Sequence, residues 1–227
     1  MRKLVLMPFF VACAGGGGEE VPVDLTDRAL PEAGISLIPD AGWPEQEDDG
    51  EMAREAAVRG TVDAVAQVGS DDAWNLHLVD EETSEGWTVQ IRSPGRAPTV
   101  EVGEVVDAEF SSVFGEFGPS SSRGEVRDGA GERLFWWGAD GALSELSPPS
   151  GIVLTLGESA GIGEDGCGEW EGFDLEATVD GESASVAYAG QAEVGAVLVT
   201  NAGLRSEVQE TECMDYYSGR AAVLLAW

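Results

Sequence analysis

Apolar and polar residues alternate with a period of two along most of this chain. The clearest stretches are 74–78, 87–91, 106–111 and 173–179, where an apolar side chain recurs at every second position. Successive side chains of a β-strand point to opposite faces of its sheet, so this period is typical of strands with one buried face. Polar or Gly-rich turns separate the alternating segments. We therefore expect an all-β protein built from antiparallel strands.

The strands are expected to form two small antiparallel β units. The Pro-rich segment Ser147–Gly151 is the best internal boundary, and it divides a first β domain at 56–146 from a second at 151–227. In the first domain, a strand, a hairpin, a Gly-Glu-Val-Val entry to a fourth strand and a closing strand at Arg133–Trp137 follow one another. This spacing resembles an OB-type barrel and implies an OB-like fold for the first domain.

The second domain is expected to be a small β-sandwich or sheet. Ile152–Leu156 is a continuous apolar run that predicts a buried strand. Alternating segments flank Asp180-Gly181, a dipeptide that tolerates the positive φ angles of a type I′ turn and so predicts a hairpin. The alternating segment Ala221–Trp227 closes the sequence, and we expect this last strand to be incorporated into a sheet.

The N-terminal residues have the pattern of an export signal. Arg2 and Lys3 precede an apolar run of nine residues, too short for a membrane-spanning helix, which needs about 20. The end of this run, Phe10-Val11-Ala12-Cys13, resembles the lipobox of bacterial lipoproteins. The resemblance implies a signal peptide at 1–12, a lipid on Cys13 and attachment of the exported chain to a cell-envelope membrane. Residues 13–55, rich in Gly, Pro and acidic residues, are then expected to be a tether.

Other interpretations of the same residues stay open. Cleavage after Ala14 would fit the small-x-small rule and release a soluble secreted protein, and a cytosolic chain with an apolar N-terminus is the third interpretation. In either exported form Cys167 and Cys213 remain, and we expect them to form a disulfide. The bridge would close a loop of 46 residues, which the chain-entropy model values at roughly 4 kcal/mol. Two separate buried thiols are the alternative.

The charge of the chain excludes one large class of partners. Asp and Glu number 43 against 12 Lys and Arg, giving a formal charge of −31. A surface of this kind repels nucleic acids and anionic lipids. Scattered carboxylates favour a role in solubility over a role in binding cations or cationic partners. The carboxylate clusters lack the spacing of an EF-hand, although a calcium site built from loops remains an alternative. No cofactor site is expected.

Two motifs resemble functional sites and fail on physical grounds. Gly157-Glu158-Ser159-Ala160-Gly161 resembles the nucleophile elbow of carboxylesterases, but the Gly-rich residues that follow do not predict the required helix. The overlapping GxGxxG string from Gly161 to Gly166 carries acidic residues where a pyrophosphate would bind. We expect residues 157–172 to form an exposed loop, with Ser159 far from His77. His77, the only histidine, is expected to be an ordinary surface or half-buried residue.

The adjacent Trp136 and Trp137 are the remaining candidates for a contact site. Neighbouring residues of a strand face opposite sides, so one of the two could be exposed to a sugar ring or a protein partner; that both sides of the strand are covered is the alternative. The function that these observations favour is a non-enzymatic envelope lipoprotein that binds a protein or glycan partner outside the cytoplasm. A carbohydrate-binding module is one alternative, and a hydrolase using Ser159 or a carboxylate pair is another.

Overall fold

The computed structural model describes residues 33–43, 52–68, 73–93, 95–115, 118–165, 168–207 and 219–227. These residues form strands and a single 3₁₀ turn, η1 (Leu143–Glu145). The strands are β1 (Gly34–Pro39), β2 (Met52–Gln67), β3 (Ala73–Asp80), β4 (Gly86–Arg92), β5 (Val105–Gly115), β6 (Gly118–Asp128), β7 (Arg133–Asp140), β8 (Ile152–Asp165), β9 (Gly168–Val179), β10 (Glu182–Val186), β11 (Gln191–Val194), β12 (Val197–Glu207) and β13 (Gly219–Ala226). The expectation of an all-β protein is confirmed.

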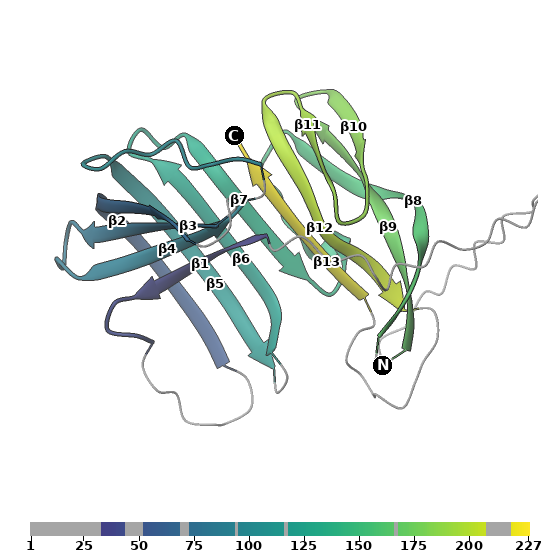
Figure 1. Cartoon of the computed structure of the whole chain (residues 1–227), viewed down its shortest axis with the longest axis horizontal. Helices are drawn as coiled ribbons and strands as arrows, with labels where there is room; N and C mark the ends of the chain where they lie inside the picture. Colours follow the sequence, from purple (N-terminus) through teal and green to yellow (C-terminus); the bar gives the residue numbers. More distant parts are fainter. Residues whose placement is uncertain are drawn as a thin grey trace, which may run out of the picture.

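All thirteen strands belong to one antiparallel sheet (Figure 1). Its order is β1-β4-β3-β2-β5-β6-β7-β13-β12-β9-β10, with β11 added to β12 and β8 added to β9. The hydrogen-bonded path does not close on itself within the described residues, so the OB-like barrel expected for the first domain is not confirmed. The strands of both expected domains are joined where β7 pairs with β13.

Strand β1 packs over the first half of the sheet and corrects the tether prediction. A Cβ atom on Gly124 of β6 would lie only 2.8 Å from the Cβ of Ile35, so the two backbones approach too closely for any larger residue. Gly34 also lies beside the ring of Trp137, where an added Cβ atom would be 3.6 Å from the nearest ring carbon, an ordinary van der Waals contact. The assignment of residues 13–55 to a tether is therefore wrong for Gly34–Pro39, whose Ile35 and Leu37 are buried in the core.

Strand β13 lies between two hydrophobic cores. One face of this strand places Ala222, Leu224 and Ala226 in the first core, which fills the space enclosed by β1 to β7. The other face places Val223 and Leu225 in the second core, among β8 to β12. The C-terminal strand is thus covered on both faces and paired on both edges, by β7 and β12. The expectation that the last segment lies within a sheet is confirmed.

Two predictions for the second half have different outcomes. The β9–β10 hairpin turns at Asp180 and Gly181 with φ angles of 49° and 91°, which confirms the expected turn. Ile152–Leu156 does form a strand, but the expectation that it is buried holds only for Ile152, which lies in the second core, and in part for Leu154, which packs against that core. Within the described residues β8 pairs with β9 alone, and Val153 and Leu156 are 57% and 55% exposed.

Candidate functional site

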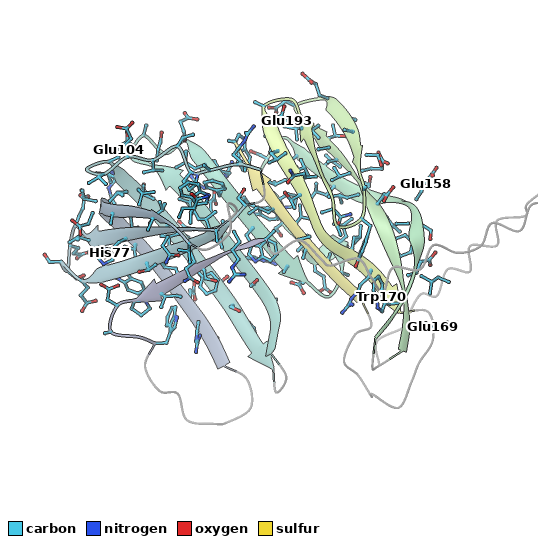
Figure 2. All side chains as sticks on the ribbon, in the orientation of Figure 1. His77, Glu104, Glu158, Glu169, Trp170 and Glu193 are labelled. Carbon is cyan, nitrogen blue, oxygen red and sulfur yellow. The ribbon has the colours of Figure 1, made fainter. Side chains whose placement is uncertain are left out.

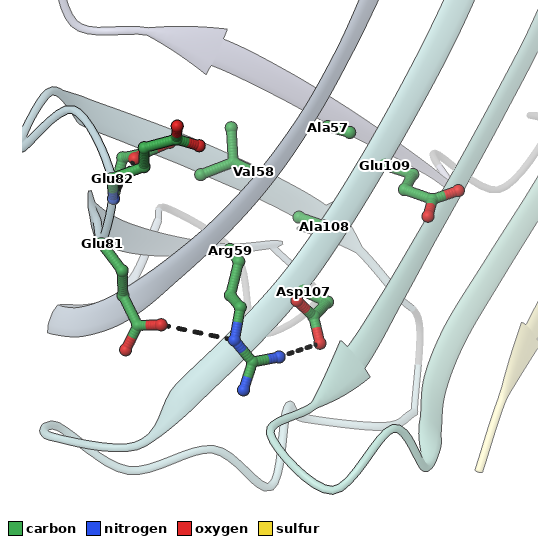
Figure 3. A pocket seen from close by; sticks show the side chains of 9 residues that line it. Ala57, Val58, Arg59, Glu81, Glu82, Asp107, Ala108 and Glu109 are labelled. Atoms are coloured by element: carbon green, nitrogen blue, oxygen red, sulfur yellow. Dashed lines mark hydrogen bonds and ion pairs between the residues drawn. The ribbon is translucent and has the colours of Figure 1, made fainter.

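The outer face of β2, β5 and β6 carries the main cluster of charged side chains. Val58, Ala108 and Val126 point into the first core, so their sequence neighbours point outward. Figure 3 shows the hollow on this face, which the outward residues line together with Val58, Ala108 and the turn after β3. Its volume is about 500 Å³. Its lining residues are Ala57, Val58, Arg59, Asp80, Glu81, Glu82, Asp107, Ala108 and Glu109.

Arg59 holds two carboxylates at the rim of this hollow. Its Nη1 atom donates to Oδ2 of Asp107 at 2.6 Å, and its Nε atom lies 3.3 Å from Oε2 of Glu81 (Figure 3). The hydrogen bond to Asp107 is the largest cause that raises the pKa of Arg59 above its ordinary value. Asp107 lies directly opposite Arg59 in the β2–β5 register, so the strand pairing itself brings the two charges together.

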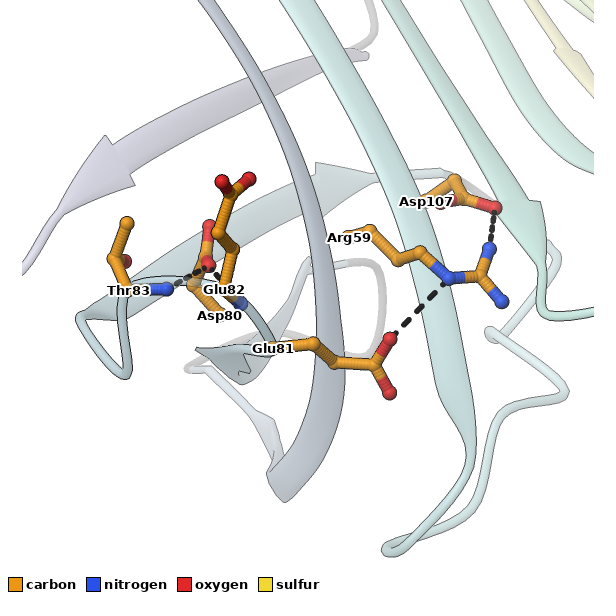
Figure 4. Close-up of polar contacts among 6 residues, drawn as sticks. All are labelled: Arg59, Asp80, Glu81, Glu82, Thr83 and Asp107. Carbon is orange, nitrogen blue, oxygen red and sulfur yellow. Dashed lines mark hydrogen bonds and ion pairs between the residues drawn. The ribbon is translucent and has the colours of Figure 1, made fainter.

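The acidic turn at the end of β3 is organised by Asp80. Its Oδ1 atom accepts hydrogen bonds from the backbone N–H groups of Glu82 and Thr83, both at 2.7 Å (Figure 4). The bond from Thr83 is the largest cause of the lowered pKa of Asp80, because it stabilises the carboxylate form. The turn places Glu81 beside Arg59 and leaves the side chain of Glu82 exposed at the hollow.

A second hollow of about 280 Å³ adjoins the first along the same face. It shares Ala57 and Glu109 with the first hollow and extends across β6 to β7. Its further lining residues are Glu55, Ala56, Phe110, Ser111, Arg123, Gly124, Glu125 and Trp136. We call the two hollows together the acidic groove.

Glu125 is the most tightly held carboxylate of the acidic groove. Arg127 donates to its Oε1 atom at 2.9 Å, and Arg133 on β7 donates to the same atom. Burial works to raise the pKa of Glu125, but the hydrogen bonds and charges of the two guanidinium groups outweigh it and the pKa is lowered. The same hydrogen bond raises the pKa of Arg127.

The groove as a whole is strongly negative. Its lining holds seven carboxylates and two guanidinium groups. Among the described residues, the exposed carboxylates of Glu55 and Glu109 form no hydrogen bond and no ion pair closer than 4 Å. Glu109 also lies opposite Glu125 in the β5–β6 register, which places two like charges side by side. A cation entering the groove would therefore relieve repulsion and find the carboxylate oxygens of Glu55 and Glu109, to which no described residue donates a hydrogen bond.

The structure corrects the prediction made for the tryptophan pair. Trp136 and Trp137 do face opposite sides of β7, as expected, but each is only 6% exposed. Trp137 lies in the first core and donates from Nε1 to Oγ of Ser122 at 2.7 Å, while Trp136 lies in the second core. Neither ring is open for stacking, because β7 is covered on both faces. Trp136 reaches the groove only at its edge.

The esterase-like string also lies in an unexpected place. The expected loop at 157–172 is wrong, since β8 runs through Ser159 to Asp165 and β9 begins at Gly168. Ser159 is an exposed residue of a strand that is followed by another strand, so no strand-to-helix elbow forms. Eight pairing steps of the sheet separate its strand from that of His77, and Figure 2 places His77 and Glu158 at opposite ends of the molecule.

His77 is half-buried, as its place in the alternation predicted. Its Nε2 atom lies 2.8 Å from Oδ2 of Asp40, and its Nδ1 atom lies 3.6 Å from Oδ2 of Asp63.

Cys13, Cys167 and Cys213 lie outside the described residues, so lipidation and the disulfide stay predictions. Within the described ranges, no three His, Cys, Asp or Glu side chains converge closely enough to hold a metal ion, and no helix could span a bilayer.

The part of the acidic groove that β6 contributes was missed at the sequence level because β6 itself was missed. Its N-terminal half, Gly118–Ser122, is rich in Gly, Pro and Ser and reads as a turn. The signal lay in the next residues, where Arg123, Glu125 and Arg127 alternate with Gly124 and Val126.

Comparison with protein-family models, with curated proteins and with solved structures finds no match to this chain.

Proposed function

We propose that this chain is an exported, non-enzymatic lipoprotein of the cell envelope, and that its acidic groove binds the Lys or Arg side chains of a partner protein. The observation that carries the proposal is the groove lining, which holds seven carboxylates and two guanidinium groups. No described residue forms a hydrogen bond with the carboxylate of Glu55 or Glu109, or an ion pair with it within 4 Å. Small-molecule sites are usually lined mainly by apolar side chains, whereas this lining is mainly charged. A charged protein surface is the better match.

The envelope location rests on the lipobox-like residues around Cys13. A chain attached there by lipid lies outside the cytoplasm, where a disulfide between Cys167 and Cys213 is stable. The described neighbours of the two cysteines support this bridge. Glu207, the last residue of β12, pairs with Trp170 at the start of β9, so the connections that contain Cys213 and Cys167 leave from the same end of the sheet.

The carbohydrate-binding alternative is not favoured, because the two tryptophans on which it rested are buried. The hydrolase alternative loses the strand-to-helix turn that would present Ser159 to a base. A protein partner needs neither feature.

Titration calorimetry with a tetralysine peptide tests the groove. We expect binding that weakens as salt is added, because the contacts are between exposed charges. The Glu55→Gln/Glu109→Gln variant should bind at least about fivefold more weakly, since each charge pair contributes on the order of 0.5 kcal/mol or more. The control is Glu101→Gln/Glu182→Gln, which removes two exposed carboxylates outside the groove. Equal losses in both variants would refute the groove and leave only the overall charge.

A further inference from the structure

Strand β8 presents a long backbone edge to solvent. Along the described chain it pairs with β9 alone, and Figure 1 shows it on the outer flank of the second half. The opposite end of the sheet is protected, because β1 packs over β6 and ends at Pro39. The edge at β10 is only five residues long. Of the sheet margins, β8 is therefore the one most available for pairing.

The first half of β8 lacks the features that usually block such an edge. Native edge strands carry charges, prolines or bulges that prevent pairing with another chain. Ile152–Leu156 contains neither a charge nor a proline, and it pairs with β9 in unbroken register until the irregularity between Leu156 and Ser159. Val153 and Leu156 expose more than half of their surfaces. An extended peptide could add here as a further strand, using backbone hydrogen bonds for affinity and these side chains for specificity.

The charge around this edge selects the occupant. Strands β8 and β9 together contain seven acidic residues and no basic one. Beside Ile152–Leu156 itself, Glu176 lies opposite Thr155 in the register, and the exposed Glu158 follows two positions after Leu156 on this flank (Figure 2). A second copy would bring the same carboxylates together in a chain of charge −31, which opposes pairing between copies. A basic extended segment would instead neutralise them.

We propose that the free edge at Ile152–Leu156 binds an extended segment of a partner protein in which apolar residues alternate with Lys or Arg. The site is distinct from the acidic groove, which lies on the first half of the sheet. The two sites can therefore succeed or fail independently.

The test uses labelled peptides of about seven residues, the length of an ordinary strand, with fluorescence anisotropy as the readout. One peptide alternates valine with lysine, and its counterpart alternates valine with glutamate. The full chain should bind the lysine peptide at least about tenfold more tightly than the glutamate peptide. Hydrogen exchange at the amides of 152–156 should slow when the lysine peptide is added, because new backbone hydrogen bonds form there.

Variants separate this edge from general charge attraction. Val153→Lys/Leu156→Lys should weaken binding of the lysine peptide at least about tenfold, since lysines on an edge block strand addition. The control Val68→Lys/Val102→Lys makes the same change at two exposed valines elsewhere and should bind within about twofold of the wild type. Glu55→Gln/Glu109→Gln should keep the slowed hydrogen exchange at 152–156 when the lysine peptide is added, which distinguishes the edge from the groove. The proposal would be overturned if the edge and control variants lost the same amount of affinity for the lysine peptide. It would also be overturned if the peptide slowed hydrogen exchange only at groove residues, or if the wild type formed a dimer that Val153→Lys abolished.

Discussion

The shared strand β13 predicts that the two hydrophobic cores unfold together. Leu224 and Leu225 are neighbours, yet Leu224 packs into the first core and Leu225 into the second, and both are at most 1% exposed. Leu224→Ala or Leu225→Ala would leave a cavity in one core without touching a hydrogen bond of the sheet. Because the same backbone supports both cores, a defect on either face should destabilise the whole structure.

The expected magnitude follows from the burial. Removing a fully buried leucine side chain typically costs about 2–5 kcal/mol, and strand β13 is held by neighbours on all sides, so little collapse into the cavity is possible. For a chain of this size each 1 kcal/mol lowers Tm by about 2–4 °C. We therefore expect each variant to melt roughly 5–15 °C below the wild type. Leu156→Ala is the control, because that side chain is 55% exposed and its loss should change stability by about 0.5 kcal/mol or less.

Differential scanning calorimetry and urea unfolding, followed by both tryptophan fluorescence and far-ultraviolet circular dichroism, check this prediction. The wild type and both variants should each show one transition that is the same for both probes. Two transitions, with Leu224→Ala lowering only one and Leu225→Ala lowering only the other, would refute the reasoning and show two independent domains.

Four further predictions concern a buried charge, the disulfide, close packing and the lipid anchor. Glu125→Gln should destabilise the protein by about 1 kcal/mol near neutral pH, because the carboxylate loses its charged hydrogen bonds. The folded-state pKa of Glu125 is lowered, so the stabilisation by its carboxylate is present above the ordinary pKa and is lost as the pH falls through the folded-state pKa. The urea midpoints of the wild type and the variant should therefore converge in acid. Cys213→Ser should lower stability by roughly 2–4 kcal/mol if the exported chain carries the disulfide, and non-reducing peptide mapping should recover Cys167 linked to Cys213 in the wild type alone. Gly124→Val should destabilise more than Gly131→Val, measured by thermal melting, because a Cβ atom at 124 would collide with Ile35 whereas the one at 131 has open space but a positive φ. Cys13→Ala should move the protein from the detergent phase to the aqueous phase, and a wild type already in the aqueous phase would contradict the lipid anchor.

The sequence predicted the parts of the fold that a local pattern controls. Period-two alternation identified the buried faces of β3, β5 and β9, and Asp180-Gly181 identified a hairpin, because both signals depend on neighbouring residues. The pairing of the C-terminal strand with β7 could not be predicted, because it joins residues about 85 positions apart and no local sequence pattern indicates it. Trp136 was misjudged for the same reason. Whether its ring is exposed depends on a second core that only the pairing of β13 brings to that face.

The groove shows the same division between local and long-range information. The alternation of Asp107 and Glu109 with apolar residues predicted that both carboxylates face away from the core. It could not predict that Arg59, Glu81 and Glu125 lie close to these two carboxylates, because that proximity depends on three separate strand pairings. What looked like scattered charge along the sequence is gathered on one face by the register of the sheet.

Backbone amide NMR during a tetralysine titration tests the central claim most directly. The acidic groove predicts that the largest shifts occur at residues 55–59, 80–82 and 107–109, at peptide concentrations that leave the equally acidic strands β9 and β10 unchanged. The Glu55→Gln/Glu109→Gln variant should lose these shifts while its remaining spectrum stays that of the folded wild type. Shifts of similar size over every acidic segment, retained in that variant, would contradict the groove and leave the negative charge with a role in solubility alone.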